Sequence, residues 1–208
     1  MRMITDGRVL HDFARTIIIP RTALPVISWD EGFFRERLSA QFFAFESALG
    51  GARFDSVLDI GCGLAAFDAY LAARCGARHI HLIDGTGIGC KVHGYTETAP
   101  APWGDVRLGV RMVQANAPTA IVTPHAPTIL ARIPSVDLVA SLRSCGHHYP
   151  VSSYLSLVRR CLRPGGALLI DLRRGTTGHS VLEAHGFIHV ATVPDHSSKC
   201  TREVFYAP

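Results

Sequence analysis

The residues best suited to bind a ligand lie at a glycine turn between an apolar strand and a helix. Ser56–Ile60 is a short apolar segment typical of a buried strand, Gly61-Cys62-Gly63 follows it, and from Leu64 apolar residues recur at helical spacing. Glycines let a backbone turn sharply and approach a ligand closely. The first turn of a helix adds free N–H groups and the positive end of the helix dipole. This arrangement predicts a cradle for a nucleotide or another anionic group.

A carboxylate, Asp84, ends the next apolar segment, residues 79–84, which we expect to form a second strand. Its two oxygens could accept hydrogen bonds from both hydroxyls of a ribose, and without ligand we expect the carboxylate to be solvated. Gly61-x-Gly63-x-x-Ala66 also fits the dinucleotide fingerprint, which includes an acidic residue about 20 residues further on. An NAD(P)-dependent oxidoreductase is therefore one interpretation, and a tight turn that binds no ligand is another.

A second group of reactive side chains lies in Arg143–Pro150, which contains His147, His148 and Tyr149. We expect this tract to be a loop that leaves the carboxyl end of an apolar strand over 136–142, the edge at which open α/β sheets bind ligands. A histidine near its ordinary pKa can act as a general base. At least one of the two histidines is thus a candidate catalytic residue. The alternative is that one histidine caps the helix that begins at Pro150 and that the tyrosine packs on it.

Strands and helices alternate from residue 53 onward, which predicts a parallel α/β sheet. A capping box at Ser28–Glu31 begins an earlier helix that ends at Leu49, so we expect residues 1–52 to be an extension with one long helix and residues 53–208 to be the main domain. The last two strands are joined too tightly for a helical crossover and should pair antiparallel. The expected strands cover 56–60, 79–84, 119–123, 136–142, 166–171, 187–193 and 202–206, and the expected helices of this domain cover 64–75, 105–115, 150–162 and 178–185.

Composition excludes several classes of protein. The 208 residues are 48% hydrophobic and carry a formal net charge of +4, so the chain should be globular. Its basic residues are dispersed, which does not favour nucleic-acid binding, although a basic stripe could assemble in space. No apolar stretch is long enough to span a membrane and no secretory signal is visible, so we expect a cytoplasmic protein without a membrane partner. The six cysteines contain no CxxC pair, which predicts buried thiols and no metal site.

Four features together resemble class I S-adenosylmethionine-dependent methyltransferases. Val57–Gly63 resembles their first motif, in which an acidic residue, here Asp59, stands two positions before the first glycine. A helical extension precedes that motif in many members. Val136–Ser141, followed by the two histidines, is similar to the fourth strand and its loop, and Cys161–Ile170 is similar to the Leu-x-Pro-Gly-Gly turn into the fifth strand. The resemblance covers about residues 53–208. It implies a Rossmann-like α/β fold, with a doubly wound, mostly parallel seven-stranded sheet and a C-terminal antiparallel hairpin.

The same resemblance implies S-adenosyl-L-methionine as cofactor and S-adenosyl-L-homocysteine as product. Asp59 should support the glycine turn and the methionine end of the cofactor, Asp84 should hold the ribose, and His125 should either border the adenine or be a solvated loop residue. Two departures stand out: Ala65 takes the place of a common third glycine, and Thr123-Pro124-His125 takes that of an acidic residue. The expected cofactor-binding residues are Asp59, Gly61, Cys62, Gly63, Asp84, Gly85 and His125, and the expected catalytic residues are His147 and His148.

The sequence thus predicts an enzyme that transfers a methyl group from S-adenosylmethionine to a small-molecule or glycan acceptor, most naturally at a hydroxyl oxygen. Cys145–Pro150 further resembles a tract in proteins classed as sugar O-methyltransferases. Residues 85–104 form a long loop rich in glycine and proline, and loops of this length are typically lids or binding loops. The oxidoreductase and a methyltransferase-like module that binds cofactor without turnover stay open as alternatives, as do protein or nucleic-acid acceptors and the oligomeric state.

Overall fold

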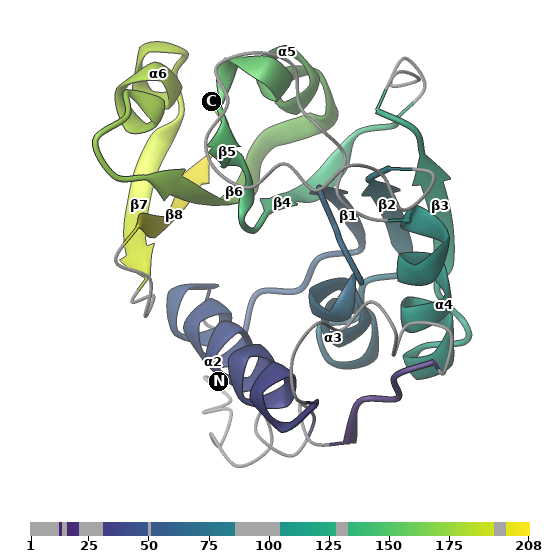
Figure 1. The fold of residues 1–208 in the computed structure, drawn as a ribbon. Coiled ribbons are helices and arrows are strands. Elements are labelled where there is room, and N and C mark those ends of the chain that lie inside the picture. Colours follow the sequence, from purple (N-terminus) through teal and green to yellow (C-terminus); the bar gives the residue numbers. More distant parts are fainter. Residues whose placement is uncertain are drawn as a thin grey trace.

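One mixed sheet organises the chain (Figure 1). The computed structural model describes Phe13 and residues 16–20, 31–49, 51–85, 105–127, 133–193 and 199–208. The strands are β1 (Ser56–Ile60), β2 (His79–Ile83), β3 (Ile121–His125), β4 (Val136–Ser141), β5 (Ser144–Tyr149), β6 (Leu162–Arg173), β7 (Ile188–Val193) and β8 (Cys200–Tyr206). Seven of them form the sheet in the order β3-β2-β1-β4-β6-β8-β7. Pairing is parallel from β3 to β6, and β8 pairs antiparallel with both β6 and β7. The expected seven-stranded sheet with a closing hairpin is therefore confirmed.

The strand order reverses beside β1. In chain order β1 is followed by β2 on one side, whereas β4 pairs with its other side. The register sets Asp59 of β1 opposite Leu82 of β2 and Ala140 of β4. Open α/β sheets bind ligands outside the carboxyl ends of the strands at such a reversal. The topology therefore puts the glycine turn, which directly follows β1, at the place where folds of this type bind ligands.

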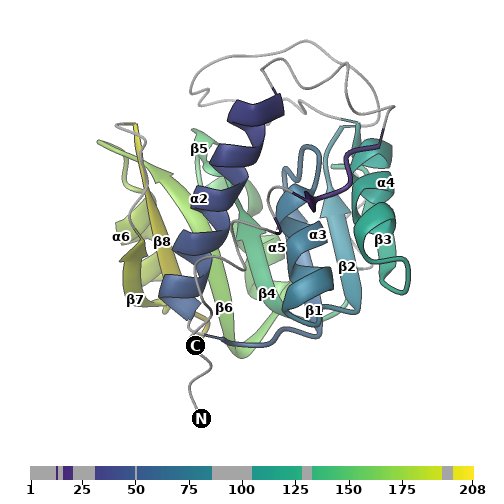
Figure 2. The ribbon, with the colours of Figure 1, turned by 90° about the horizontal axis from the view of Figure 1, so that it is seen from below.

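Helices cover both faces of the sheet (Figures 1 and 2). They are α2 (Glu31–Leu49), α3 (Ala66–Arg74), α4 (Val106–Asn116), α5 (Ser152–Cys161) and α6 (Gly178–Ala184). Side chains of β1 alternate between the faces: Val57 joins the apolar cluster under α2, α3 and α4, and Leu58 and Ile60 join the cluster under α5 and α6. Because helices cover both faces, Val57, Leu58 and Ile60 of β1 are all apolar and buried, and Asp59 is the charged exception.

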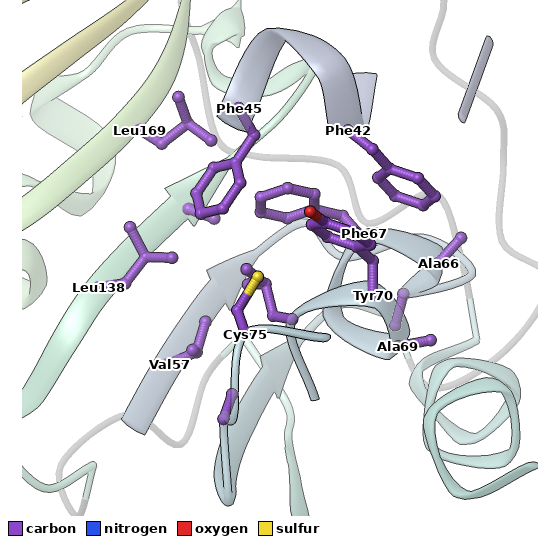
Figure 3. Close-up of a cluster of buried hydrophobic side chains, with 14 of the residues drawn as sticks. Phe42, Phe45, Val57, Ala66, Phe67, Ala69, Tyr70, Cys75, Leu138 and Leu169 are labelled. Atoms are coloured by element: carbon purple, nitrogen blue, oxygen red, sulfur yellow. The ribbon is translucent and has the colours of Figure 1, made fainter. Parts of the chain in front are cut away.

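Aromatic side chains attach α2 to α3. The rings of Phe42 and Tyr70 are stacked with centroids 4.3 Å apart, and those of Phe45 and Phe67 meet edge-on at 5.1 Å (Figure 3). Glu46 accepts a hydrogen bond from the Tyr70 hydroxyl. Such ring pairs contribute about 0.5–1.5 kcal/mol each beyond their burial. Since α3 begins just after the glycine turn, the packing of α2 on α3 stabilises the helix that follows the turn.

Most predicted elements lie within about two residues of their observed ends, and β6 is the longest exception. The third strand begins at Ile121 rather than at residue 119, because Ala120 N–H donates to Ala117 O at 3.0 Å and closes a turn over Pro118–Ala120. β6 runs from Leu162 to Arg173 rather than over 166–171. The predicted capping box begins at Ser28 and falls outside the described residues.

The tract after β4 is a strand, so the prediction of a loop over 143–150 is wrong. Cys145 N–H donates to Ser141 Oγ at 2.9 Å, and Arg143 adopts a left-handed φ of 57°, which together turn the chain back sharply. β5 then contacts β6. A Cβ built on Gly146 would lie 2.8 Å from Leu172 Cδ2 and 2.9 Å from Asp171 O, so this approach requires glycine.

Two composition-based expectations can be compared with the fold. Cys75, Cys145, Cys161 and Cys200 are buried and Cys62 is half-buried, and all five thiols are free. Across the described ranges, no helix combines the length and apolar character needed to cross a membrane.

Candidate active site

The glycine turn is fixed on one side and open on the other. Gly61 has φ +79° and Gly63 has φ +54°, the left-handed region that favours glycine. The N–H groups of Gly61 and Cys62 donate to Ile83 O at 2.8 and 3.2 Å, which ties the turn to the end of β2. A Cβ built on Gly61 would lie 1.9 Å from Ser144 Oγ, whereas one on Gly63 would meet no described atom within 4 Å. Packing therefore requires Gly61, while a ligand could approach the backbone at Gly63.

Asp84 joins the two segments that form this edge. Gly63 N–H donates to Asp84 Oδ2 at 2.7 Å, and Gly85 N–H donates to Asp84 Oδ1 at 2.7 Å. The side chain is 5% exposed, so the expectation that it is solvated without ligand is wrong; the amides of the turn draw it inward. A carboxylate offers about four acceptor positions, so it can accept several hydrogen bonds at once. Asp84 can thus order the turn and still accept a hydroxyl.

Two further carboxyl groups are buried beneath the turn. Asp59 of β1 is 3% exposed, and Asp68 in the first turn of α3 is fully buried. Among the described residues, Asp59 Oδ1 and both oxygens of Asp68 lack a hydrogen-bond partner. Burial raises the pKa of Asp59 well above its ordinary value, with repulsion from Asp68 adding to it, and burial raises the pKa of Asp68 to about 7. Two carboxylates cannot hydrogen-bond, but one proton lets them do so, and we expect the pair to share it.

Sequence reasoning missed Asp68. An aspartate in the first turn of a helix is ordinarily a solvated partner of the helix dipole. Its signal was its place in a helix whose neighbouring residues Phe67, Ala69, Tyr70 and Leu71 are all apolar or aromatic and prove to be buried. A charged residue in so apolar a segment needs a partner, and Asp59 is the group within its reach.

Two residues of the turn keep their side chains on the helix side. Burial raises the pKa of the Cys62 thiol, with the charges of Asp84 and Asp59 adding to it, so the thiol is neutral. Ala65 caps α3 with φ 53° and ψ 34°, in the left-handed region, and its side chain is buried. Glycine adopts this left-handed conformation without strain, which explains why the resemblance predicts a glycine where this chain has Ala65.

His125 ends β3 beside the end of β2, where it pairs in register with Ile83. Its Nε2 lies 3.0 Å from His81 Nδ1, so its ring points back along the strands toward His81. Burial lowers the pKa of His125 and lowers that of His81 to about 4. Repulsion from His125 adds to the shift of His81. A neutral pair can share one hydrogen bond. His125 thus lies at the same edge as Asp84, one strand further out.

His147 and His148 lie side by side in β5, with ring centroids 4.7 Å apart. His147 is 5% exposed, and its Nδ1 has no hydrogen-bond partner among the described residues. Burial lowers the pKa of His147 to about 4, with repulsion from His148 adding to it. The sequence-based expectation of a base near its ordinary pKa therefore does not hold for His147, which is neutral above about pH 5 and remains able to accept a proton.

The ends of β5 connect the histidines to the glycine turn. Ser144 lies directly against Gly61, and its Oγ is 2.7 Å from Tyr149 Oη in a buried hydrogen bond. Burial raises the pKa of Tyr149, with the Cys145 thiol adding to the shift. The structure thus gathers Gly61, Asp84, Ser144 and Tyr149 at one edge, and Ser144 was not among the predicted residues. The predicted loop beyond Gly85 falls outside the described residues as far as residue 104.

Known proteins resemble this chain in fold rather than in sequence. No protein-family model matches the sequence, and no curated protein matches it. Among solved structures, the N-methyltransferase NodS from Bradyrhizobium japonicum WM9 in complex with S-adenosyl-L-homocysteine is 16% identical with a TM-score of 0.58, and the match covers 96% of this chain and 98% of that one.

Two other similar structures carry different activities. The T. thermophilus 16S rRNA N2 G1207 methyltransferase RsmC, in complex with AdoMet and guanosine, is 16% identical with a TM-score of 0.56, over 83% of this chain and 43% of that one. The CurJ carbon methyltransferase is 14% identical with a TM-score of 0.50, over 83% and 53% of the two chains. The fold of this chain is therefore shared with methyltransferases that act on nitrogen, on carbon and on RNA.

Proposed function

We propose that this chain, whose fold is that of the class I methyltransferases, transfers a methyl group from S-adenosylmethionine to a hydroxyl oxygen of a small-molecule or glycan acceptor. The observation that carries the proposal is the position of Asp84, which accepts the N–H groups of Gly63 and Gly85 at the carboxyl edge beside the strand-order reversal. A carboxylate held in this way by the turn is ready to receive the hydroxyls of a ribose.

The charges around the turn favour S-adenosylmethionine over a dinucleotide. Asp59, Asp68 and Asp84 lie together beneath and beside the turn. Asp59 Oδ1 and both carboxyl oxygens of Asp68 have no hydrogen-bond partner among the described residues. Even when Asp59 and Asp68 share one proton, the cluster is negative. A dinucleotide would bring its anionic pyrophosphate against the same helix start, whereas the sulfonium and ammonium groups of S-adenosylmethionine are cationic. Like charges oppose the first ligand and opposite charges favour the second.

The residues present fit that cofactor, with a separate task for each. No described atom would crowd a ligand at the backbone of Gly63, Asp84 would hold the ribose, and His125 would border the adenine. When bound, S-adenosylmethionine supplies a methyl group already activated by its sulfonium. The protein then has to orient the acceptor, exclude water and receive a proton.

β5 is the segment that we assign to the acceptor. It begins against the glycine turn at Ser144 and carries the neutral His147, whose Nδ1 has no partner among the described residues. A hydroxyl acceptor loses its proton as the new C–O bond forms, and a neutral imidazole nitrogen can take that proton. The choice of a hydroxyl acceptor, rather than a nitrogen or carbon acceptor, is the part of the proposal that depends on His147 or His148 as the base.

Parallel calorimetric titrations test the cofactor. S-adenosylhomocysteine should bind and raise the melting temperature by mass action. NAD and NADP should give no heat of binding and should leave the melting temperature unchanged. A clear thermal shift with NAD or NADP, and none with millimolar S-adenosylhomocysteine, would overturn the assignment. Incubation with isotopically labelled S-adenosylmethionine and a panel of sugars, amines and RNA fragments, read by mass spectrometry, identifies the acceptor. Labelled product from amines or RNA alone would reject the hydroxyl, and binding without any turnover would indicate a cofactor-binding module.

A further inference from the structure

A cluster of nitrogen and oxygen ligands lies at the other end of the sheet. His179 belongs to the start of α6, His189 to β7 and Glu203 to β8. One ligand atom from each lies within 4.8 Å of the other two. β4 and β6 separate β8 from β1 in the sheet, so this cluster is distinct from the site at the glycine turn. Figure 1 shows α6 packed over the β7–β8 hairpin, the arrangement that brings the three residues together.

We propose that His179 Nδ1, His189 Nε2 and Glu203 Oε2 bind a zinc ion. Two imidazoles and one carboxylate form a known zinc ligand set, in which a water molecule completes the tetrahedron. Imidazole nitrogen favours zinc and its transition-metal neighbours over magnesium and calcium, which prefer oxygen. The sequence-based prediction of no metal site considered only cysteine spacing, and these ligands come from three separate elements without a short motif.

The distances are close to those that a tetrahedral ion requires. Ligand atoms bound to zinc at about 2.0–2.1 Å lie about 3.3 Å apart. His179 Nδ1 is 2.5 Å from Glu203 Oε2, and His189 Nε2 is 3.9 Å from the same oxygen. One spacing must widen and the other must shorten by less than about 1 Å. The His179 side chain is 40% exposed at the start of a short helix, so it has room to rotate.

Neighbouring groups already orient two of the ligands. Glu183 Oε1 lies 3.3 Å from His179 Nε2, so it can accept a hydrogen bond from the ring nitrogen that faces away from the ion. Thr201 Oγ1 donates to Glu203 Oε1 at 2.7 Å and leaves Oε2 for the ion. Phe205 lies edge-on to both imidazoles, with centroids 5.3 and 5.2 Å away. Carboxylate and hydroxyl partners of this kind fix the tautomer and direction of metal ligands.

The alternative is that the cluster serves only as an ion pair between His179 and Glu203. That pair accounts for the short hydrogen bond, and Glu203 raises the pKa of His179. It does not account for the position of His189, whose Nε2 has only a long contact of 3.4 Å with Thr192 Oγ1 and lies 3.9 Å from the carboxylate, and whose ring centroid is 4.9 Å from that of His179. Two imidazoles pointing at one carboxylate repel each other when protonated, whereas a metal ion attracts both.

Zinc titration of the full chain, after chelator treatment and dialysis, tests the proposal. Wild-type protein should bind one Zn²⁺ per chain and melt at a higher temperature with zinc, while Mg²⁺ should have neither effect. His189→Ala and Glu203→Gln should weaken zinc binding by about 100-fold or more, and Thr201→Val by about 10-fold. His185→Ala is the matched control, because His185 is an exposed histidine at the end of the same helix that contacts Val181 O. It should bind zinc as the wild type does.

A second readout separates this site from zinc bound by cysteine thiols. The Co²⁺ form should show tetrahedral absorption bands without a thiolate-to-metal charge-transfer band. Circular dichroism and melting in chelator establish that each variant is folded before zinc is added. If wild-type protein shows no saturable zinc binding, if folded His189→Ala and Glu203→Gln match it, or if the Co²⁺ spectrum shows thiolate ligation, the proposal is overturned. None of these measurements depends on methyl transfer.

Discussion

Asp59 and Asp68 lie within hydrogen-bonding reach of each other in the core beneath the glycine turn, each supplied by a different element. Their neighbours are apolar or acidic: Phe67 and Ala69 flank Asp68 on α3, and Asp84 adds a third negative charge. A buried carboxyl pair of this kind is stable only with a proton between its members. The pair therefore makes the stability of the site depend on pH in a direction opposite to that of an ordinary salt-bridged carboxylate.

Replacing Asp68 by Asn should remove part of that dependence. In the folded protein the pKa of Asp68 is raised from 3.8 to about 7, so the folded state holds the proton more tightly than the unfolded chain. Stability from this group is complete below about pH 4 and is lost as pH rises to about 7. Asp68→Asn should unfold with a higher free energy than wild type at pH 8, by on the order of 2–4 kcal/mol, and with a similar one at pH 4.5. Urea unfolding at pH 4.5 and at pH 8 measures this difference. A variant less stable than wild type at pH 8 would contradict the raised pKa of Asp68.

Asp84→Asn should weaken S-adenosylhomocysteine binding and also lower stability. Loss of charge-assisted hydrogen bonds to ribose costs about 1.5–3 kcal/mol, or roughly 10- to 150-fold in affinity. Because Gly63 and Gly85 also donate to this carboxylate, the melting temperature should fall as well. The matched control is Asp137→Asn, since Asp137 Oδ2 accepts the N–H groups of Asp55 and Ser56 at 2.7 and 3.0 Å at the other edge of the sheet.

Calorimetry separates the two variants. Asp137→Asn should lose stability but keep its affinity for S-adenosylhomocysteine. Equal affinities in both variants would mean that Asp84 only orders the turn.

The histidines of β5 should affect turnover rather than cofactor binding. A general base contributes about 10²–10⁴-fold in rate, so either His147→Ala or His148→Ala should lose that much in single-turnover reactions, with affinity for S-adenosylhomocysteine within a few fold. If His147 is the base, its pKa of about 4 keeps it deprotonated, and the wild-type rate should stay flat from pH 8 to about pH 5.5. A rate that falls over that range would exclude His147. If both variants lose less than tenfold in single-turnover rate, neither histidine is the base and both only position the acceptor.

The two glycines of the turn should respond differently to alanine. At Gly61 the new Cβ would lie 1.9 Å from Ser144 Oγ, which adds an overpacking cost of about 1–3 kcal/mol to a left-handed strain of about 1–2 kcal/mol. Gly63→Ala carries only the strain, which Ala65 already tolerates at φ 53°, but fills space beside the backbone and should weaken S-adenosylhomocysteine binding.

A second substitution isolates the contact with Ser144. Ser144→Gly should recover part of the stability lost in Gly61→Ala and none of that lost in Gly63→Ala. Equal costs for the two alanine variants in urea unfolding would show that Gly61 does not pack against β5 as described.

The parts of this fold that the sequence predicts are those in which local pattern and tertiary burial agree. β1 is apolar at Val57, Leu58 and Ile60 because both faces of the sheet are covered, and the glycine turn follows from residue type alone. β5 was predicted as a loop because its conformation depends on contacts distant in sequence, above all the close approach of Gly146 to β6. The burial of Asp84 likewise arises from backbone amides, which leave little trace in the residue types themselves.

The position of β8 has a consequence for the order of folding. β8 follows β7 in the chain but lies between β6 and β7 in the sheet, and Arg202 on β8 donates to Asp171 on β6 at 2.8 and 3.0 Å in a buried ion pair. Until residues 200–206 leave the ribosome, β7 lacks the strand that it pairs with and Asp171 lacks the guanidinium of Arg202. Strands β3, β2, β1 and β4 can assemble during synthesis, but β6 and β7 cannot be joined in the sheet until β8 has been made. A nascent chain stalled before residue 200 should thus expose the edge of β6 to chaperones.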